Sequence, residues 1–526
     1  MTAPTSPTTW LGLISEQAAQ RPDGIALVDG ERTLTWPEFE DRVRRIASAL
    51  TDLGIGRGDI VGIWLPNCLE WFESAAALAA LGATALGVNT KLRSHDVAGL
   101  LERSGCSTLI THPGFKGIDF LGMLSEIDDS HPDAVSAVVT LGTETVGDRG
   151  FRQVPYAHLL AAEPLSDITT DDPQTPSNAF TSSGSSGVPK IIMHTQASVL
   201  GHSAAVAEAF GYHGEDVVVL AALPMCGVFG LNTAAAGMCA GAPVVLQDVF
   251  EPAATAALIA EHRVTHSNMA DGMLRMLLDT AEASQLGSLR EIGFGNFTAT
   301  DVTGLIREGD ALGVRFFQTY GSSEVQALMT YPSPAADAER RTLGGGVPVS
   351  PRTEVRIAAE DGSREGEIMV RGPFVSIGRI ASAGYETTPV DAEGWFGTGD
   401  LGYMAADRDV VYLNRMGDVL RLGGFLVSPR EVEDFLIELP GIREAQFVAV
   451  EGSEKGLRPV AFVIPEPGED FDEAEVLAAC KRELAGFKVP KRIVALEEFP
   501  VIRGANGDKI QRSALRDAAA ELLDHS

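Results

Sequence analysis

A run of small, hydroxyl-bearing residues that ends on a proline and a lysine has the composition of an anion-binding loop. It reads Thr181-Ser182-Ser183-Gly184-Ser185-Ser186-Gly187-Val188-Pro189-Lys190. Its glycines let the backbone turn so that several N–H groups point inward, and such a concave run binds anions, phosphate above all. The serine hydroxyls add donors and the lysine adds a mobile positive charge. The run therefore predicts a phosphate site that differs from the Gly-x-x-x-x-Gly-Lys-Ser/Thr loop; a flexible linker is the alternative.

A second glycine turn carries a tyrosine and a glutamate. The segment Gln318 to Glu324 follows an apolar stretch, and a glycine turn at the C-terminal end of a strand is where α/β sheets bind ligands. Glu324 can hold Mg²⁺, a hard ion that prefers carboxylates and phosphate oxygens, and Tyr320 can stack on a base. The alternative is a surface turn with a solvated glutamate.

Three later stretches place charged residues beside glycines. In Gly394 to Gly402, the carboxylate of Asp400 can accept hydrogen bonds from two ribose hydroxyls, although such a stretch alone is typical of a β-turn. Asn414 to Asp418 precedes the pair Gly423-Gly424, which can serve as a flexible joint. Near the C-terminus, Lys509 follows a glycine turn, where a lone lysine is normally a solvated charge.

Alternating apolar segments indicate the elements that must position these residues. A helix is expected from Trp36 onward, because a proline suits its first turn and apolar residues follow at 4-3-4 spacing. Short apolar runs such as 60–65 and 107–111 are typical of buried strands, and helical stretches such as 68–81 alternate with them. This alternation predicts parallel sheets covered by helices, whereas the segment 143–174 is polar and irregular.

The pattern changes after Tyr331, where short alternating segments between Gly/Pro turns predict a β-rich region. A last block of strands and helices begins near Asp418. We therefore expect an α/β protein with a large N-terminal domain at 1–417, built of helix-covered, mostly parallel sheets and a β-rich subdomain. A small α+β domain at 418–526 follows, joined by a hinge, in line with a chain too long for one core.

The net charge of the chain narrows its partners. The 526 residues carry 41 basic and 72 acidic side chains, a formal charge of −31. An acidic surface repels the phosphate backbone, which argues against nucleic acid as a partner, and is otherwise typical of a well-solvated protein. No stretch is long and apolar enough to predict a membrane span, and Met1 to Ser15 lacks the pattern of an export signal.

The cysteines and histidines form no metal-binding pattern. None of the five cysteines belongs to a Cys-x-x-Cys pair and most lie in apolar runs, so we expect reduced core residues in a cytoplasmic protein. His262 and His266 have helical spacing, but no acidic or cysteine partner lies nearby in sequence. We interpret them as structural residues.

Taken together, in this order and at these separations, the five stretches resemble the adenylate-forming superfamily. Its members include acyl-CoA and aryl-CoA synthetases, the adenylation domains of nonribosomal peptide synthetases and firefly-type luciferases. The resemblance runs from about residue 25 to the C-terminus, and five ordered motifs are far more specific than any one of them. It implies an enzyme, an AMP-forming ligase that uses ATP and Mg²⁺.

The resemblance also implies a role for each motif residue. Tyr320 resembles the adenine-stacking tyrosine, and Glu324 resembles the magnesium ligand, which makes it a catalytic residue. Asp400 and Arg415 resemble the ribose contacts, and 182–190 is similar to the loop that wraps the ATP β- and γ-phosphates. The implied ATP- and AMP-binding residues are Ser182, Ser183, Gly184, Ser185, Ser186, Gly187, Lys190, Tyr320, Gly321, Ser323, Asp400 and Arg415.

The implied reaction has two halves. A small carboxylic acid attacks the α-phosphorus of ATP, pyrophosphate leaves and an acyl-AMP forms; the thiol of coenzyme A then takes the acyl group and AMP is released. Lys509 resembles the catalytic lysine that contacts both the carboxylate and the α-phosphate. Asp418 resembles the hinge about which the small domain rotates between the halves. Positive charge is needed because two anions must approach each other.

The chain departs from the family pattern in places that we expect to lie around the acyl pocket or its wall. Gly227 stands at the gate position, Asp271 stands near the usual proline, and Gln196 replaces a histidine. The stretch 293–299 lacks the usual Ala-Pro. A polar Asp271 together with the aromatic Phe294 and Phe297 favours a polar acid, aryl or amino-bearing, over a long fatty chain. Ordinary drift at permissive positions is the alternative explanation of the departures. The expected substrate-pocket residues are Gly227, Asp271, Phe294, Gly295, Asn296 and Phe297.

Several acceptors stay open for the second half. A stand-alone acyl- or aryl-CoA ligase comes first. A free-standing adenylation enzyme that loads a carrier protein is the second hypothesis. The third is an adenylating enzyme with a non-thiol acceptor, which forms an amide or activates nitrite for diazotisation of an aryl amine. A non-catalytic binding protein is disfavoured, because mere binding does not need Lys509.

Overall fold

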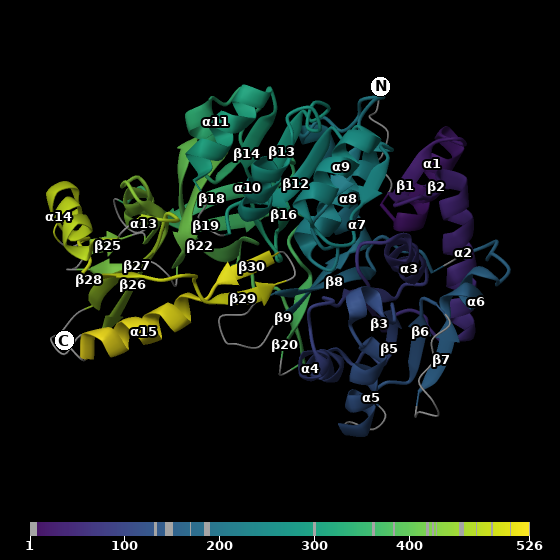
Figure 1. Ribbon diagram of the computed structural model, residues 1–526. Coiled ribbons are helices and arrows are strands. Elements are labelled where there is room, and N and C mark those ends of the chain that lie inside the picture. The colour runs from purple at the N-terminus through teal and green to yellow at the C-terminus, as the bar shows by residue number, and fades with distance from the viewer. Residues whose placement is uncertain are drawn as a thin grey trace.

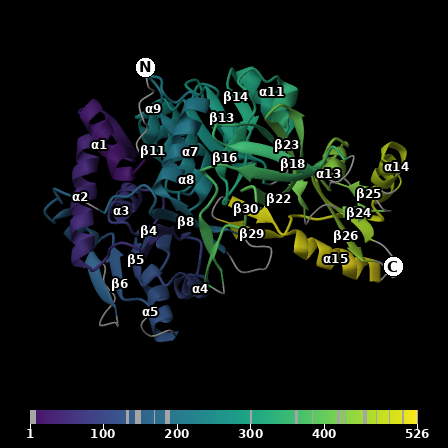
Figure 2. The same cartoon turned by 180° about the vertical axis from the view of Figure 1, so that it is seen from behind.

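The computed structural model describes residues 8–130, 134–142, 151–168, 170–182, 190–297, 301–359, 363–381, 384–416, 420–422, 425–427, 429–451, 457–469, 471–484, 486, 488–504 and 507–524. The chain forms a large body of three β-sheets with helices around and between them, and a small C-terminal lobe at one end (Figure 1). Figure 2 shows the same division from behind.

The first sheet has nine strands in the order β21-β20-β9-β8-β4-β3-β5-β6-β7. They are β3 (Ile60–Trp64), β4 (Thr84–Gly87), β5 (Thr108–Thr111), β6 (Ala137–Thr140), β7 (Arg152–Pro155), β8 (Pro176–Ser182), β9 (Lys190–Thr195), β20 (Gly378–Ala381) and β21 (Gly384–Thr387). Neighbours from β8 through β4 and β3 to β7 are parallel, and neighbours from β8 to β21 are antiparallel. Ser182 pairs with Lys190, so the predicted phosphate loop joins two adjacent strands.

The second sheet has seven strands in the order β14-β13-β12-β10-β11-β1-β2. They are β1 (Ile25–Asp29), β2 (Arg32–Thr35), β10 (Val219–Ala221), β11 (Val244–Leu246), β12 (His266–Ala270), β13 (Glu291–Gly295) and β14 (Arg315–Gln318). All neighbours are parallel except β1 and β2. This confirms the predicted helix-covered, mostly parallel sheets.

Helices cover both sheets and fill the space between them. They are α1 (Trp10–Gln20), α2 (Trp36–Asp52), α3 (Leu69–Ala80), α4 (Ser94–Ser104), α5 (Phe120–Ser130), α6 (Tyr156–Leu160), α7 (Gln196–Ala209), α8 (Val228–Ala240), α9 (Pro252–His262), α10 (Asp271–Thr280), α11 (Val302–Leu312) and α12 (Ala338–Thr342), with a 3-10 turn at Phe115–Gly117. The largest apolar cluster joins residues of both sheets through α3, α7 and α8. One cluster packs α4 and α5 on the outer face of the first sheet, and another packs α9, α10 and α11 on the second.

Helix α2 begins where the sequence predicts a helix start. Thr35 is its N-cap and accepts from the backbone N–H of Glu38, whose carboxylate in turn accepts from the Thr35 N–H. This capping box satisfies two otherwise unpaired donors. Phe39, Val43 and Leu50 are buried on one face, as their spacing predicts.

The third sheet is antiparallel and has the strand order β15-β16-β17-β23-β22-β19-β18. Its strands are β15 (Tyr320–Ser322), β16 (Gln326–Tyr331), β17 (Gly345–Pro348), β18 (Glu354–Ala359), β19 (Gly366–Arg371), β22 (Phe396–Ala406) and β23 (Asp409–Arg415). This is the predicted β-rich region, but it begins at Tyr320 rather than after Tyr331. The glycine turn of the second motif is therefore part of this sheet.

The C-terminal lobe has its own apolar clusters. Its elements are β24 (Leu420–Leu422), β25 (Phe425–Val427), α13 (Pro429–Ile437), β26 (Ile442–Glu451), β27 (Leu457–Pro465), α14 (Glu473–Glu483), β28 (Arg492–Ala495), β29 (Val501–Gly504), β30 (Gly507–Ile510) and α15 (Arg512–Asp524). In Figure 1 the β29–β30 hairpin extends from this lobe toward the middle of the molecule. The expected domain boundary at 417/418 lies outside the described residues.

The segment expected to be irregular contains two regular elements, β7 and α6. A buried carboxylate explains why the chain is ordered there. Glu73 on α3 is fully buried, pairs with Arg42 at 2.6 Å and accepts from the Tyr156 hydroxyl at 3.0 Å. An unpaired buried charge is costly, so Tyr156 completes a polar network that local polarity did not reveal. In the described ranges, no helix is long and apolar enough to cross a membrane.

Candidate active site

Tyr320, Asp400 and Arg415 come together from the strands β15, β22 and β23 of the third sheet. The Tyr320 hydroxyl donates to Asp400 Oδ2 at 2.6 Å, and Arg415 Nη1 donates to Asp400 Oδ1 at 2.8 Å. Asp400 and Arg415 are paired across the β22–β23 hairpin. The Tyr320 ring stacks on Tyr412, with centroids 5.0 Å apart and planes 19° apart. Three residues from separate motifs therefore form one hydrogen-bonded group with a fixed aromatic plane.

The Asp400 carboxylate is buried, whereas its arginine partner reaches solvent. Asp400 is 4% exposed and the Arg415 side chain is 50% exposed. Burial raises the pKa of Asp400, and the charge of Arg415 together with the Tyr320 hydrogen bond opposes that rise. An ionised carboxylate has about four lone-pair sites, so two protein donors leave room for two further hydrogen bonds.

The half-buried Glu324 lies in the turn between β15 and β16, close to this group. The Ser322 hydroxyl donates to Glu324 Oε2 at 3.0 Å, and the Glu324 carbonyl accepts from the Ser376 N–H at 2.7 Å. The negative charge of Glu324 acts on both Asp400 and Arg415. The turn requires Gly321, because a Cβ there would lie 2.4 Å from the Gln326 carbonyl oxygen.

A series of buried polar side chains holds this turn in place, and the sequence did not predict it. His194 Nε2 donates to the Ser323 carbonyl at 2.7 Å. Gln326 Nε2 donates to His194 Nδ1 at 2.9 Å, and Gln326 Oε1 accepts from Asn232 Nδ2 at 3.1 Å. Burial lowers the pKa of His194 to about 4, so its ring is neutral near pH 7. These side chains tie β9 and α8 to the Glu324 turn.

One signal in the sequence could have found these residues. His194 follows three apolar residues of a strand, and Gln326 precedes Ala327-Leu328-Met329. A polar side chain inside a buried apolar run needs a partner. What the sequence hides is the backbone of Gln326, whose φ of 67° lies in the left-handed region. Glutamine rarely adopts that conformation, so the hydrogen bonds of its side chain help to hold it.

The phosphate-loop residues lie partly outside the described ranges. Ser182 ends β8, and the half-buried Lys190 begins β9, four residues before His194. The β9 strand therefore carries both the end of the loop and His194, whose ring contacts the Glu324 turn. The predicted residues Ser183, Gly184, Ser185, Ser186 and Gly187 fall outside the described residues, as does the hinge residue Asp418. Lys509 lies on β30, where its backbone pairs with Ile502.

The acid-side residues gather where the second sheet meets α8. A Cβ on Gly295 would lie 2.8 Å from the Phe297 ring and 3.4 Å from the Phe229 ring. The Phe297 N–H donates to Asp271 Oδ1 at 3.0 Å, so Asp271 at the start of α10 fixes this loop. Asn296 lies between Gly295 and Phe297, and Gly227 caps α8 directly before Val228.

Phe294 and Gln196 lie apart from these residues. Phe294 faces the cluster under α9, α10 and α11, because successive side chains of β13 point to opposite faces. Gln196 begins α7, where its Oε1 accepts from the Trp10 N–H at 2.9 Å and its Nε2 donates to Asp171 at 3.1 Å. The expectation that every departure lies at the acyl pocket is therefore wrong for Gln196, which anchors α1 instead.

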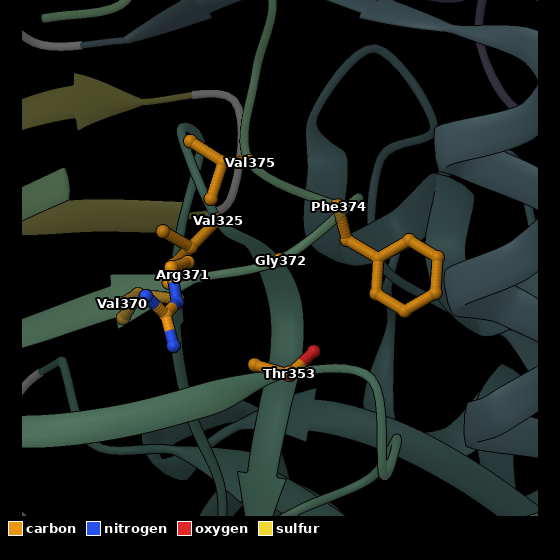
Figure 3. A pocket seen from close by; sticks show the side chains of 7 residues that line it. All are labelled: Val325, Thr353, Val370, Arg371, Gly372, Phe374 and Val375. Carbon is orange, nitrogen blue, oxygen red and sulfur yellow. The ribbon is translucent and has the colours of Figure 1, made fainter. Parts of the chain in front are cut away.

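A small hollow, too tight to hold a water molecule, lies beside the Glu324 turn (Figure 3). Its lining residues are Val325, Thr353, Val370, Arg371, Gly372, Phe374 and Val375. The Phe374 ring points away from the valines in Figure 3 and packs edge-on against His202, with centroids 5.7 Å apart. Arg371 is engaged by Glu354 at 2.6 Å. The hollow is a packing gap with mostly apolar walls, not a continuation of the site.

The C-terminal lobe contacts the third sheet of the large body. Helix α13 packs against β23, and the charges of Arg430 and Arg512 act on Tyr412. Within the lobe, Arg512 donates to both oxygens of the buried Glu433 at 2.8 and 2.9 Å, and Glu433 also accepts from the Phe447 N–H at 2.9 Å. This pair links α13 to the residues that follow Lys509.

Comparison with known proteins agrees with this geometry. The family described as AMP-binding enzyme matches residues 14–378, and the family described as AMP-binding enzyme C-terminal domain matches residues 431–505. The chain is 30% identical to a 2-succinylbenzoate–CoA ligase of Geobacillus kaustophilus, over 94% of this chain and 95% of that one. It is also 30% identical to an indoleacetate–CoA ligase of Aromatoleum aromaticum, over 96% and 97%.

Solved structures show the same architecture. The o-succinylbenzoate CoA synthetase of Bacillus subtilis, in complex with its acyl-adenylate intermediate, superposes with a TM-score of 0.79 at 26% identity, over 98% of this chain and 99% of that one. The same enzyme with ATP and a magnesium ion gives a TM-score of 0.77. The expected α/β fold with a smaller C-terminal domain and the expected AMP-forming acid–thiol ligase are both confirmed. The chain belongs to the AMP-binding enzyme family of adenylate-forming ligases.

Proposed function

We propose that this protein activates a small carboxylic acid with ATP, forming an acyl-AMP and pyrophosphate, and then transfers the acyl group to the thiol of coenzyme A. The observation that carries the proposal is the joining of Tyr320, Asp400 and Arg415 beside Glu324. This group brings together a hydroxyl, a carboxylate, a guanidinium and an aromatic ring, and that combination suits a nucleoside and its phosphates.

Asp400 is the ribose-binding residue in this proposal, with Arg415 beside it. Its two protein donors hold the carboxylate in place and leave acceptor sites for the ribose hydroxyls. The half-exposed Arg415 can reach ribose or phosphate oxygens. Tyr320, whose plane is set by Tyr412, stacks on adenine together with the backbone of Gly321 and Ser323.

Glu324 is the protein ligand for Mg²⁺. In the part of the chain that the structure describes, no three His, Cys, Asp or Glu side chains gather into a metal site. One carboxylate held by Ser322 fits an ion that takes its other ligands from water and the phosphates of ATP. When bound, the ion neutralises charge on the phosphates. Ser182 to Lys190 would hold the β- and γ-phosphates at the adjacent strand ends.

Lys509 supplies the positive charge for the first half-reaction. The carboxylate of the acid forms a bond to the α-phosphorus while the bond to pyrophosphate breaks, and both reacting groups are anionic. A lysine placed between them offsets their repulsion. The small domain at 418–526 turns at Asp418 after this step, which removes Lys509 and opens the path for the thiol.

The acid is aryl or polar rather than a long fatty chain. Phe229 and Phe297 pack edge to face on each other beside Gly295, and an aromatic wall next to a glycine suits a flat ring. The two relatives named above act, by their names, on 2-succinylbenzoate and indoleacetate. The five cysteines are all free, which supports a reducing compartment such as the cytoplasm.

The test is pyrophosphate release across a panel of aryl, polar and fatty acids, with and without coenzyme A, with products identified by mass spectrometry. We expect release with an aryl acid and a CoA thioester when CoA is present. Release without a thioester would instead favour a carrier protein, an amine acceptor or nitrite as the activated acid. No release with any acid would refute the proposed function.

A further inference from the structure

A buried amide lies in the middle of β12, one of the strands that border the site. Asn268 is 0% exposed. Strand alternation points Asn268 and His266 to the face shared with α7 and α8, whereas Met269 joins the cluster under α9 to α11. A polar side chain in this position needs hydrogen-bond partners.

Only half of this amide is satisfied. Asn268 Nδ2 donates to the Tyr212 hydroxyl at 3.2 Å, which sets the orientation of the group. Asn268 Oδ1 is buried and has no hydrogen-bond partner among the described residues. An unpaired acceptor inside a protein lowers stability, so a leucine of similar size would suit this position better if the side chain only filled space.

The free oxygen lies over a glycine at the edge of the site. Asn268 and Gly293 are paired across β12 and β13, which lie side by side with β14 in Figure 1. A Cβ on Gly293 would lie 2.3 Å from Asn268 Oδ1 and 3.1 Å from Thr319 Cγ2. Any larger residue at 293 would therefore displace the amide.

This position lies between the two halves of the proposed site. Thr319 is half-buried and immediately precedes Tyr320. Gly295, two residues after Gly293, borders Phe297 and Phe229 on the acid side. Asn268 lies two residues before the carboxyl end of β12. Its oxygen is therefore two residues short of the strand ends, where nucleotide-side and acid-side residues meet and where α/β sheets place their ligands.

We propose that Asn268 Oδ1 accepts a hydrogen bond from an amino or hydroxyl substituent on the ring of the acid, so that the substrate is an amino- or hydroxyl-substituted aryl acid. This inference rests on the proposed function and narrows its substrate class. Binding the correct acid supplies the missing donor, whereas an acid without a donor leaves the oxygen unpaired. Sites built in this way discriminate strongly against analogues that lack the group.

The wild-type enzyme gives the first test. Matched benzoic, phenylacetic and bicyclic aryl acids carry amino, hydroxyl, methyl or methoxy groups at each ring position, and kcat/KM for pyrophosphate release is measured for each. At one position we expect the amino or hydroxyl acid to exceed its methyl analogue by about 10- to 100-fold. Equal use of methyl and donor acids at every position would overturn the proposal, and so would a preference for methoxy, which accepts but cannot donate.

The variant Asn268→Leu gives the second test. It removes the oxygen with little change in volume. The ratio of kcat/KM for the amino or hydroxyl acid to that for its methyl analogue should therefore fall to near 1, because kcat/KM for the amino or hydroxyl acid decreases. KM for ATP should stay unchanged. An unchanged preference would overturn the proposal.

Asn232→Leu is the matched control. Asn232 on α8 is equally buried and also has an unpaired Oδ1, but its Nδ2 belongs to the series of polar side chains that holds the Glu324 turn. Asn232→Leu should keep the preference for the amino or hydroxyl acid over its methyl analogue even if overall activity falls. If Asn232→Leu lost this preference as much as Asn268→Leu does, the preference could not be assigned to Asn268. If no acid released pyrophosphate, the proposed function and this inference would fail together; release that ignores the substituent refutes the inference alone.

Discussion

Replacing Asp400 with asparagine would test the nucleotide half of the site with little change in shape. The carboxylate of Asp400 accepts from Tyr320 at 2.6 Å and from Arg415 at 2.8 Å, and is buried. Asparagine retains one acceptor oxygen but introduces an NH₂ group, which faces a donor on at least one side. The charge that holds Arg415 and the proposed ribose hydroxyls is lost.

The size of the effect follows from the number and type of these bonds. Hydrogen bonds to an ionised acceptor are roughly twice as strong as neutral ones. Weakening two ribose bonds by about 1 kcal/mol each gives about 2 kcal/mol, or about a 30-fold rise in KM for ATP. Folding stability should fall less, by about 1 kcal/mol, because the Arg415 side chain is 50% exposed and its ion pair is screened.

The assay is pyrophosphate release at saturating acid, with ATP, 2′-deoxy-ATP and 3′-deoxy-ATP varied in turn. The wild type should prefer ATP over the deoxy nucleotides, and Asp400→Asn should lose most of that preference. Asp409→Asn is the matched control, because it also removes an arginine–aspartate pair, with Arg340, from the same sheet. Equal KM values for ATP in Asp400→Asn and the wild type, or unchanged discrimination against deoxy nucleotides, would refute the ribose role.

Two further predictions concern Lys509 and the buried histidines. Lys509→Ala should reduce acyl-AMP formation by at least 100-fold and spare thioester formation from supplied acyl-AMP; equal loss in both half-reactions would contradict its role. Burial lowers the pKa of His202 from 6.5 to about 4, so the folded state resists protonation and stability is lost as pH falls from 6.5 toward 4. His202→Gln keeps a donor for the Ala327 carbonyl and should reduce that slope, measured by urea unfolding, by up to about 1.4 kcal/mol per pH unit. An unchanged slope would assign the acid sensitivity to other groups.

Local patterns predicted most of the regular elements. The capping box at Thr35 and the apolar spacing of α2 could be predicted from the sequence, because the residues that define a helix lie within a few positions of one another. The strand β3 and the helix α3 were similarly clear. The elements β7 and α6 were not predicted because they depend on a long-range contact, the hydrogen bond from Tyr156 to Glu73. The residues near Tyr156 in the sequence do not indicate that contact.

The candidate site was predicted by residue type but not by arrangement. Tyr320, Asp400 and Arg415 were predicted from their motifs, yet their mutual hydrogen bonds depend on the register of β22 and β23. His194 and Gln326 each lie in an apolar run, which is a signal that a partner is needed, but the sequence does not show that they are partners of each other. The positive φ of Gln326 is also not visible in the sequence. Phe294 could have been separated from Gly295 by strand alternation alone, whereas the place of Gln196 depends on its contact with α1.

The pair of Glu433 and Arg512 makes the C-terminal lobe a candidate for exchange between related enzymes. Its bonds join the first helix of the lobe to the residues just after Lys509, 79 positions later, and the buried Gln446 also accepts from Arg512 at 3.1 Å. A chimera joined before Pro429 would take both Glu433 and Arg512 from one parent. A junction after α13 would take Glu433 from one parent and Arg512 from the other. The buried glutamate would then depend on the second parent for its arginine partner. The useful breakpoint is therefore decided by this ion pair rather than by sequence similarity around the junction.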